Sequence, residues 1–190
     1  MARVKSGDKH NAILSAATQV FAERGLGAAT SAISSAAGVA EGTLFKYFST
    51  KDELLNALYR EIKVDLADVM MSGFPRKKSV RHRLQHVWEQ FVEWGVQNPM
   101  QQRVLSQIEL WGGLTEESKS AGMAPFVEIQ KTVEDAMAER IFKDLPEQCI
   151  TATVRALSEM TTDLVRKNPE EADKYRSAGF EILWAGIARK

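Results

Sequence analysis

The residues at positions 41–51, EGTLFKYFSTK, combine polar side chains with closely spaced aromatic rings. Thr43 offers a hydroxyl group for a phosphate or a base, and its methyl group can meet the methyl of a thymine. Lys46 and Tyr47 follow three and four residues later, so on a helix they lie on the same side as Thr43 and can reach phosphates. A core strand, a ligand lid and a helix that reads nucleic acid all remain possible until the flanking residues are considered.

The flanking residues carry the signals of helices. An apolar stripe at helical spacing predicts a first helix, which Gly25 ends. Thr30 or Ser31 can cap a brief second helix at residues 32–37, and a third helix is expected at residues 40–48. Two short helices that follow a longer one and are separated by a turn describe a helix-turn-helix, whose last helix enters the major groove of DNA.

The other residues of this segment suit the same arrangement. Leu44 and Phe48 are four residues apart and are expected to face inward, because so short a helix needs large anchors. Gly42 lets the backbone come close to a duplex. Lys51 begins a fourth helix and can bind a phosphate together with the free N–H groups there. Ser49 and Asp52 form a variant of the capping box at the same helix start.

The segment AAGVAEGTLFKYFSTKDELL, residues 36–55, resembles the DNA-binding signature of the TetR family of transcriptional regulators. The segment ILSAATQVFAERG, residues 13–25, is similar to the first helix of that family, whereas the remainder resembles it only in length and helical character. The resemblance implies a homodimer that binds a pseudo-palindromic operator, usually as a repressor. It also implies a C-terminal helical domain that senses a small molecule, whose binding spreads the two DNA-binding heads apart.

The resemblance also implies which residues contact DNA, with Lys51 in the place of the phosphate-binding lysine. Phe45 stands where the family usually has Tyr, so any contact through that hydroxyl is absent. Ala40 replaces the usual Ser cap, at a cost of about 1 kcal/mol in helix stability. The turn before the second helix is one residue shorter than usual, which affects the contacts of Thr30 and Ser31. The expected DNA-contacting residues are Thr30, Ser31, Glu41, Gly42, Thr43, Phe45, Lys46, Tyr47 and Lys51.

Helical periodicity continues to the C-terminus, and no alternating pattern of a β-strand occurs. The fourth helix is expected to end near Met71, before a loop that contains Gly73 and Pro75. Further helices are expected from the apolar faces at residues 80–91, 104–111, 126–137 and 150–165 and from the start signal Asn168-Pro169. We therefore expect an all-α chain of about nine helices. Residues 1–50 would form the DNA-binding domain, and residues 51–190 a helical bundle for effector binding and dimerisation.

Aromatic residues gather in the middle of this second region. Core packing must account for some of them, but pockets between bundled helices are typically lined by apolar and aromatic side chains with a few polar groups. Under the family resemblance, an uncharged or amphipathic effector is expected there, although Arg103 or Glu109 could meet a charge. Met123 is a further candidate. The expected ligand-binding residues are Trp88, Phe91, Trp94, Met100, Gln107, Trp111, Phe126 and Met137.

The last helix contains small residues at Ala178, Gly179, Ala185 and Gly186. Glycine costs about 1 kcal/mol in a helix interior relative to alanine, so two of them indicate a close helix approach. That approach is either to a second subunit or to the first or fourth helix of the same chain. The family resemblance favours a homodimer that forms through the last two helices, within residues 150–165 and 172–187.

The sequence carries no enzyme motif: it lacks a phosphate-binding loop, a nucleophile elbow, zinc-type Cys/His spacing and HExxH. Cys149 is expected to be buried and inert rather than a redox sensor. His82 and His86 share a helix face and could hold a metal, but a third ligand would have to come from elsewhere, so we interpret them as surface or pocket-edge residues. We expect no catalysis, no metal and no cofactor.

The composition is that of a globular protein, with 44% apolar and 26% charged residues and zero net charge. The balance of charge argues against a nonspecific polycation. The single cysteine suits a reducing compartment, and neither a secretory signal nor a run of about 18 apolar residues occurs, so we expect a cytoplasmic protein without membrane association. The alternative function is a helical adaptor that keeps the DNA-binding head but responds to a protein partner.

Overall fold

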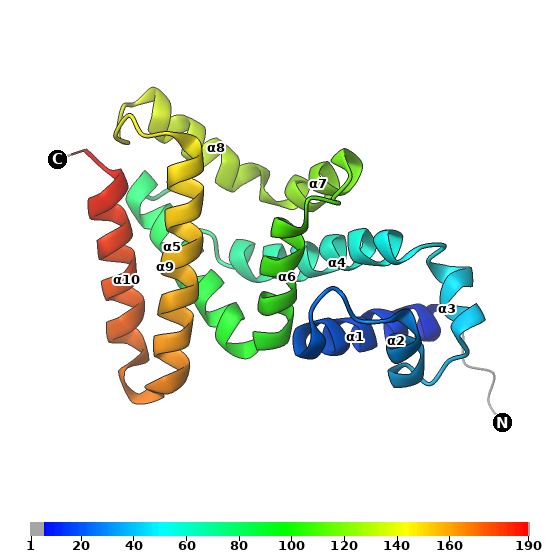
Figure 1. The fold of residues 1–190 in the computed structure, drawn as a ribbon. Helices are drawn as coiled ribbons and strands as arrows, with labels where there is room; N and C mark the ends of the chain where they lie inside the picture. Colours follow the sequence, from blue (N-terminus) through cyan, green and yellow to red (C-terminus); the bar gives the residue numbers. More distant parts are fainter. Residues whose placement is uncertain (1–5, 190) are drawn as a thin grey trace. The chain divides into compact units, whose positions relative to one another are not determined.

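The computed structural model describes residues 6–189 (Figure 1). Within this range the chain is helical, and its only β interaction there is one bridge between Phe142 and Ala188. The expected all-α fold is confirmed. Over the same residues, no helix has both the length and the apolar content that a membrane span requires. The α-helices are α1 (Ser6–Arg24), α2 (Thr30–Ala36), α3 (Glu41–Tyr47), α4 (Lys51–Met71), α5 (Val80–Gln97), α6 (Pro99–Trp111), α7 (Glu116–Met123), α8 (Val127–Ala138), α9 (Glu147–Lys167) and α10 (Ala172–Ile187).

The chain forms two compact units, each built from two separate segments. The first combines Met1–Val64 with Asn98–Ala124 and therefore holds α1, α2, α3, α6, α7 and most of α4. The second combines Asp65–Gln97 with Pro125–Lys190 and holds α5, α8, α9 and α10. The helices that carry the DNA-binding resemblance thus share a unit with α6 and α7.

In the first unit, α1 packs against both α2 and α6, and α2 packs against α3. The apolar stripe expected on the first helix is buried, which is why that helix can hold the two short ones. The buried apolar side chains of this core include Ile13, Leu14, Ala17, Phe21, Ile33, Leu44, Phe48, Leu54, Leu55 and Leu58.

In the second unit, α9 and α10 lie side by side with opposite directions (Figure 1), and α5 packs against both of them and against α8. Trp88 is central to this core, and its indole N–H donates to the carbonyl of Arg176 at 3.0 Å. A Cβ atom on Gly179 would lie 2.3 Å from Oγ1 of Thr161 and 2.8 Å from the Trp88 ring. Gly179 therefore packs closely within its own chain, but against α5 and α9 rather than against the first or fourth helix. The core cluster is Trp88, Val92, Val165, Phe180 and Leu183.

The start of α2 differs from the prediction. Its N-cap residue is Ala29, which makes no side-chain cap bond, and Thr30 is already the first helical residue. The hydroxyl of Thr30 instead donates to Oε1 of Glu41 at 2.9 Å. The prediction that Thr30 or Ser31 caps this helix is wrong, because the helix begins two residues earlier than its apolar pattern indicated.

The start of α4 has a capping box, one residue later than expected. The backbone N–H of Glu53 donates to Oγ1 of Thr50 at 3.0 Å. The Glu53 carboxylate accepts from the backbone N–H of Ser49 at 2.7 Å and from its hydroxyl at 2.6 Å. The pair is therefore Thr50 with Glu53 rather than Ser49 with Asp52, and Ser49 adds a further donor.

Helix α7 was not expected. Oγ1 of Thr115 accepts from the N–H of Ser118, and Glu116 and Glu117 occupy the first turn, where acidic residues are favoured. The segment has few apolar residues at helical spacing, so the sequence did not indicate a helix here. The following helix, α8, ends at Ala138, and Arg140 then adopts a positive φ of 55°. Cys149, near the start of α9, is exposed, so the expectation that it is buried is wrong.

Candidate nucleic-acid interface

The turn between α2 and α3 is closed by backbone hydrogen bonds. The N–H of Ala37 donates to Ile33, that of Gly38 to Ser35, and that of Val39 to Ser34, at 2.9, 3.2 and 3.0 Å respectively. Gly38 has a φ of 66°, a conformation that glycine adopts without strain. The turn therefore fixes the direction of α3 by backbone geometry, and glycine is the residue that this geometry favours.

Helix α3 has a buried side and an exposed side. Leu44 is fully buried and Phe48 is 2% exposed, which confirms that both face inward. Glu41, Gly42, Phe45 and Lys46 are exposed, while Thr43 and Tyr47 are half-buried. A helix of seven residues is too short to be stable alone, so these two anchors hold it while its other side stays accessible.

Gly42 lies on the accessible side with space around it. A Cβ atom built there would meet nothing within 4 Å among the described residues. Packing within the protein therefore does not require glycine at this position. We expected Gly42 to let the helix backbone come close to a duplex. This stays a prediction, and the open space around Gly42 is compatible with it.

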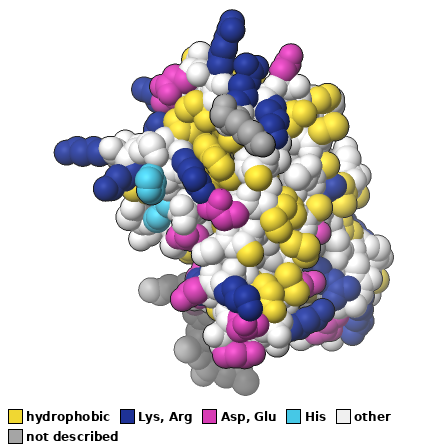
Figure 2. Space-filling model, turned by 90° about the vertical axis from the view of Figure 1, so that its left-hand side faces the viewer, with side chains coloured by type: hydrophobic (Ala, Val, Ile, Leu, Met, Phe, Trp, Pro, Cys, Tyr) yellow, Lys and Arg dark blue, Asp and Glu magenta, His cyan; other side chains and the backbone are white. Residues whose placement is uncertain are grey.

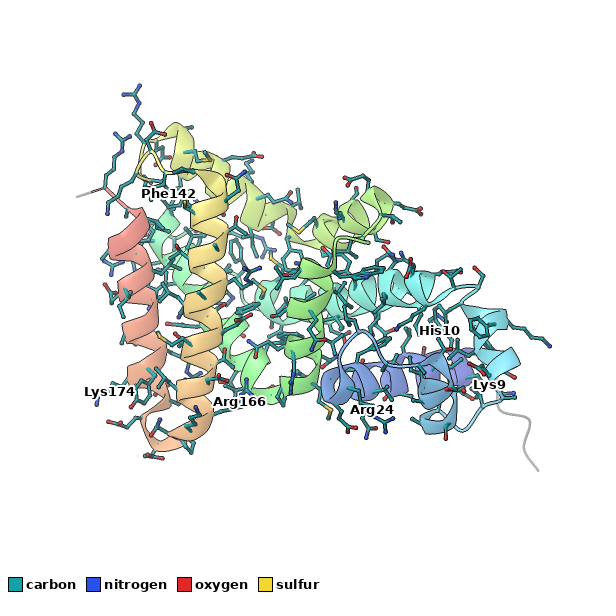
Figure 3. The ribbon with its side chains drawn as sticks, viewed as in Figure 1. Lys9, His10, Arg24, Phe142, Arg166 and Lys174 are labelled. Atoms are coloured by element: carbon teal, nitrogen blue, oxygen red, sulfur yellow. The ribbon has the colours of Figure 1, made fainter. Side chains whose placement is uncertain are left out.

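Tyr47 and Phe48 contact α1 through His10. The His10 ring lies 5.1 Å from the ring of Phe48 and 6.2 Å from that of Tyr47, measured between centroids. Figure 3 labels His10 in α1, near α3. The sequence gives no sign of this contact, because His10 and the two aromatic residues are far apart in the chain.

Lys51 has a partner within the protein. Its Nζ donates to the carbonyl of Ala28 at 2.8 Å and lies 5.7 Å from the centroid of the Phe21 ring. The side chain thereby ties the start of α4 to the loop between α1 and α2. The phosphate contact expected of Lys51 stays a prediction, and a substitution there would also remove this tie.

The first unit contains a buried charge, Lys63, that was not among the expected site residues. Lys63 of α4 lies 3.9 Å from Glu109 of α6, and its Nζ is 5.9 Å from the centroid of the Tyr59 ring. Burial lowers the pKa of Lys63, and it raises the pKa of Tyr59, to which the charge of Glu109 adds. The sequence did contain a signal for this burial. Lys63 lies four residues after Tyr59 and three before Leu66, so it shares the apolar face of its helix.

The second unit holds two half-buried arginines that were also not among the expected site residues. Nη1 of Arg83 in α5 donates to Oγ1 of Thr132 in α8 at 3.2 Å, and Arg83 lies 3.8 Å from Asp135. Nη1 of Arg176 donates to Glu93 at 2.7 Å. These contacts join helices that the sequence could not pair, and they place polar groups among the apolar side chains of this unit.

The residues expected to bind a ligand do not share one environment. Met100, Gln107 and Trp111 belong to α6 in the first unit, and the other five belong to the second. Met100 is 50% exposed and Met137 is 64% exposed, so both lie on the surface. Phe91, Gln107 and Trp111 are half-buried, and Trp88, Trp94 and Phe126 are buried. A ligand site at these residues stays a prediction.

The two histidines of α5 have separate partners. His82 is exposed, and its Nδ1 lies 2.7 Å from the hydroxyl of Ser79. Nε2 of His86 lies 3.1 Å from the carbonyl of Met70, and its ring packs edge-on against Phe74. In the described part of the chain, no three His, Cys, Asp or Glu side chains are grouped to hold a metal ion.

A helix-turn-helix whose last helix is accessible on one side is the arrangement of a DNA-binding head. Residues 13–58 match the family described as bacterial regulatory proteins, tetR family. The match covers the helix-turn-helix and the start of α4, so this part of the chain is a DNA-binding domain of the tetR family.

Solved structures have a similar fold over nearly the whole chain. A protein from Shewanella sp. PV-4 that is assigned to the same family is 24% identical, with a TM-score of 0.82 and coverage of 96% of this chain and 99% of that one. A TetR family regulator from Marinobacter aquaeolei VT8 is 20% identical, with a TM-score of 0.80 and coverage of 97% of both chains. The regulator FadR from Bacillus subtilis, solved in complex with stearoyl-CoA, is 21% identical, with a TM-score of 0.65 and coverage of 93% and 98%.

Proposed function

We propose that this regulator represses transcription by binding a pseudo-palindromic operator as a homodimer, and that a small amphipathic effector releases it. Residues 1–50 would form the DNA-binding domain and residues 51–190 the effector-binding and dimerisation domain. One observation supports DNA binding most directly: Leu44 and Phe48 anchor one side of α3 in the core, and the other side stays accessible. The proposed contacts come from Thr30, Ser31, Glu41, Gly42, Thr43, Phe45, Lys46, Tyr47 and Lys51.

The proposed contacts divide by chemistry. Lys46 is exposed and carries a positive charge, so it suits a phosphate, whose neutralisation makes binding depend on salt. Thr43 is near the start of α3, the part of a recognition helix that faces base edges. Tyr47 is half-buried against His10, so its ring is held while its hydroxyl can reach the DNA backbone.

The proposed dimer uses the exposed sides of α9 and α10. Ala178, Ala185 and Gly186 are exposed, and Ile182 between them is 55% exposed. Hydrophobic side chains occur in patches among charged ones on the face that carries α10 (Figure 2). Small exposed residues beside an exposed isoleucine suit close packing against the same face of a second copy, the arrangement of a two-fold interface. Gly179 is not part of this proposal, because it packs inside its own unit.

The proposed effector is amphipathic, with a long apolar chain. Two observations support this class: the buried aromatic residues Trp88, Trp94 and Phe126, and the acyl thioester held by FadR, which has a similar fold. A polar end could meet one of the half-buried arginines of the same unit, Arg83 or Arg176, as polar groups fix the orientation of ligands in apolar sites. If the effector is an acyl thioester, its acyl chain is required for binding, so coenzyme A alone should have no effect.

The experiment is a mobility-shift titration of the full-length protein with the DNA upstream of its own coding region, because such regulators often control neighbouring genes. We expect one retarded species that protects a two-fold symmetric site, and a dimer in light scattering. Stearoyl-CoA should then release the DNA, whereas coenzyme A alone should not. Binding to DNA without release by any amphipathic compound would favour the adaptor hypothesis, in which a protein partner controls the head.

A further inference from the structure

Glu41 and Thr30 form a pair in the helix-turn-helix. Each is the first residue of its helix, α3 and α2 respectively, and the Thr30 hydroxyl donates to Oε1 of Glu41 at 2.9 Å. Glu41 is exposed on the accessible side of α3, next to Gly42. The bond holds the carboxylate in one orientation and leaves Oε2 as an acceptor for another group.

The chemistry of a carboxylate restricts what Glu41 can bind on a duplex. An ionised carboxylate accepts hydrogen bonds and cannot donate them. Phosphate oxygens are also negative acceptors, so Glu41 is repelled by the DNA backbone. Its favourable partner must therefore be a donor on a base edge.

Only two such donors face the major groove: the amino group of cytosine and that of adenine. Adenine presents its N7 acceptor beside the amino group, so an amide side chain suits it and a carboxylate meets repulsion there. Guanine and thymine present acceptors alone apart from the thymine methyl. Cytosine is the base that matches a fixed carboxylate.

The geometry points to Glu41 as a specificity-determining residue that selects cytosine at one base pair of each operator half-site, with Thr30 as its positioning residue. This inference rests on the proposed DNA-binding function and adds to it a property of the operator. It also explains why a negative charge lies on the side of α3 that would approach DNA. The carboxylate accepts a hydrogen bond from cytosine and is repelled by the acceptors of the other bases.

Thr30 contributes through orientation. A free glutamate loses side-chain entropy when it binds a base, and a side chain already held by a hydroxyl loses less. Removing the hydroxyl should therefore weaken the preference for cytosine without replacing it by another base. Serine at this position keeps the donor and should keep the preference.

The test is selection of binding sites from a random duplex library by the full-length protein, followed by titration of the selected site and its single-base variants. Wild-type protein should enrich cytosine at one position of each half-site and lose roughly tenfold or more in affinity when that base pair is changed. E41Q should move the preference to adenine, and E41A should lose it. T30V should reduce the discrimination, and T30S should restore it.

The matched control is E23Q, which removes an exposed carboxylate of α1 that is held in a similar way, by Gln19 at 3.1 Å. It should leave the base preference unchanged. An unaltered cytosine preference in E41A would overturn the inference. So would a base other than cytosine in the wild-type site at the position where E41Q changes the preference. Failure of the proposed function would look different, because the wild-type protein would then enrich no symmetric site.

Discussion

The ring of His10 in α1 meets the ring of Tyr47 in α3 edge-on, with 6.2 Å between their centroids and an angle of 65°. The same imidazole lies 5.1 Å from Phe48, the anchor at the end of α3. His10 thus contacts both the residue that holds the helix and one that is proposed to touch DNA. A position on the first helix can therefore influence binding without contacting DNA itself.

We expect H10A to weaken operator binding through Tyr47. Paired rings contribute about 0.5–1.5 kcal/mol beyond their buried area, so the loss should be a few-fold in the dissociation constant. H10F keeps a ring and should retain most of the affinity. The measurement is a double-mutant cycle with Y47A in DNA titrations at constant salt. Additive effects of H10A and Y47A would show that His10 does not act through the tyrosine.

Lys46 and Lys51 should respond differently to alanine. K46A removes an exposed charge, so it should reduce the slope of log affinity against log salt by about one and leave unfolding unchanged. K51A also removes the bond to Ala28, so it should lower the free energy of unfolding by about 0.5–1.5 kcal/mol in addition to flattening the salt dependence. Salt titrations and urea unfolding of both variants check this. Equal stability of K51A and K46A would contradict the role of the Ala28 contact.

Two glycines should give opposite results. G42A adds a methyl group where the protein has space, so we expect unchanged or slightly higher stability, by up to about 1 kcal/mol, together with weaker operator binding. G179A places a methyl group against Thr161 and Trp88, so unfolding should become easier by about 1–3 kcal/mol. Thermal unfolding and DNA titration of both variants separate the two cases. Full affinity in G42A would exclude close approach of the backbone at that position.

The sequence predicted the DNA-binding head well because its signals are local. The end of the first helix at Gly25, the inward pair Leu44 and Phe48 and the uncapped start at Ala40 all depend on residues within a few positions of one another. The contact between His10 and Tyr47 joins two helices, and no local pattern announces it. Helix α7 was missed for another reason, since its start signal at Thr115 precedes a segment with little apolar periodicity.

For residues 51–190, the sequence predicted most of the helices but did not determine which residues bind a ligand. Helical spacing marks which residues are apolar, yet it does not say whether an apolar side chain fills a core or faces a ligand. Trp88 illustrates the difficulty, since its indole N–H is bonded to Arg176 within the core cluster. Met137, from the same list of candidates, is exposed. The ion pair between the buried Lys63 and the exposed Glu109 depends on how α4 meets α6, which the sequence of either helix does not specify.

The start of α3 offers a way to stabilise the head. Ala40 is its N-cap residue, with extended backbone angles and no side-chain cap bond. A40S supplies a hydroxyl acceptor for a free N–H of the first turn and should raise the free energy of unfolding by about 0.5–1 kcal/mol. A29S, at the equally uncapped start of α2, is the matched variant and should have a similar effect. Urea unfolding measures both, and a destabilised A40S would mean that the cap geometry does not accept a side chain.

The capping box of α4 should make stability depend on acid. The pKa of Glu53 is lowered from its ordinary 4.5 because its carboxylate accepts hydrogen bonds from the hydroxyl and the backbone N–H of Ser49. A carboxyl whose pKa is lower in the folded state stabilises that state above its unfolded pKa, and the contribution is lost as the pH falls through the folded pKa. E53Q should therefore unfold more easily than wild type at neutral pH, and the difference should shrink as the pH drops below 4.5. Unfolding temperatures across this range check the sign, with E61Q on the outer side of the same helix as the control variant. A difference that stays constant from neutral to acidic pH would show that the charge of Glu53 contributes nothing to the cap.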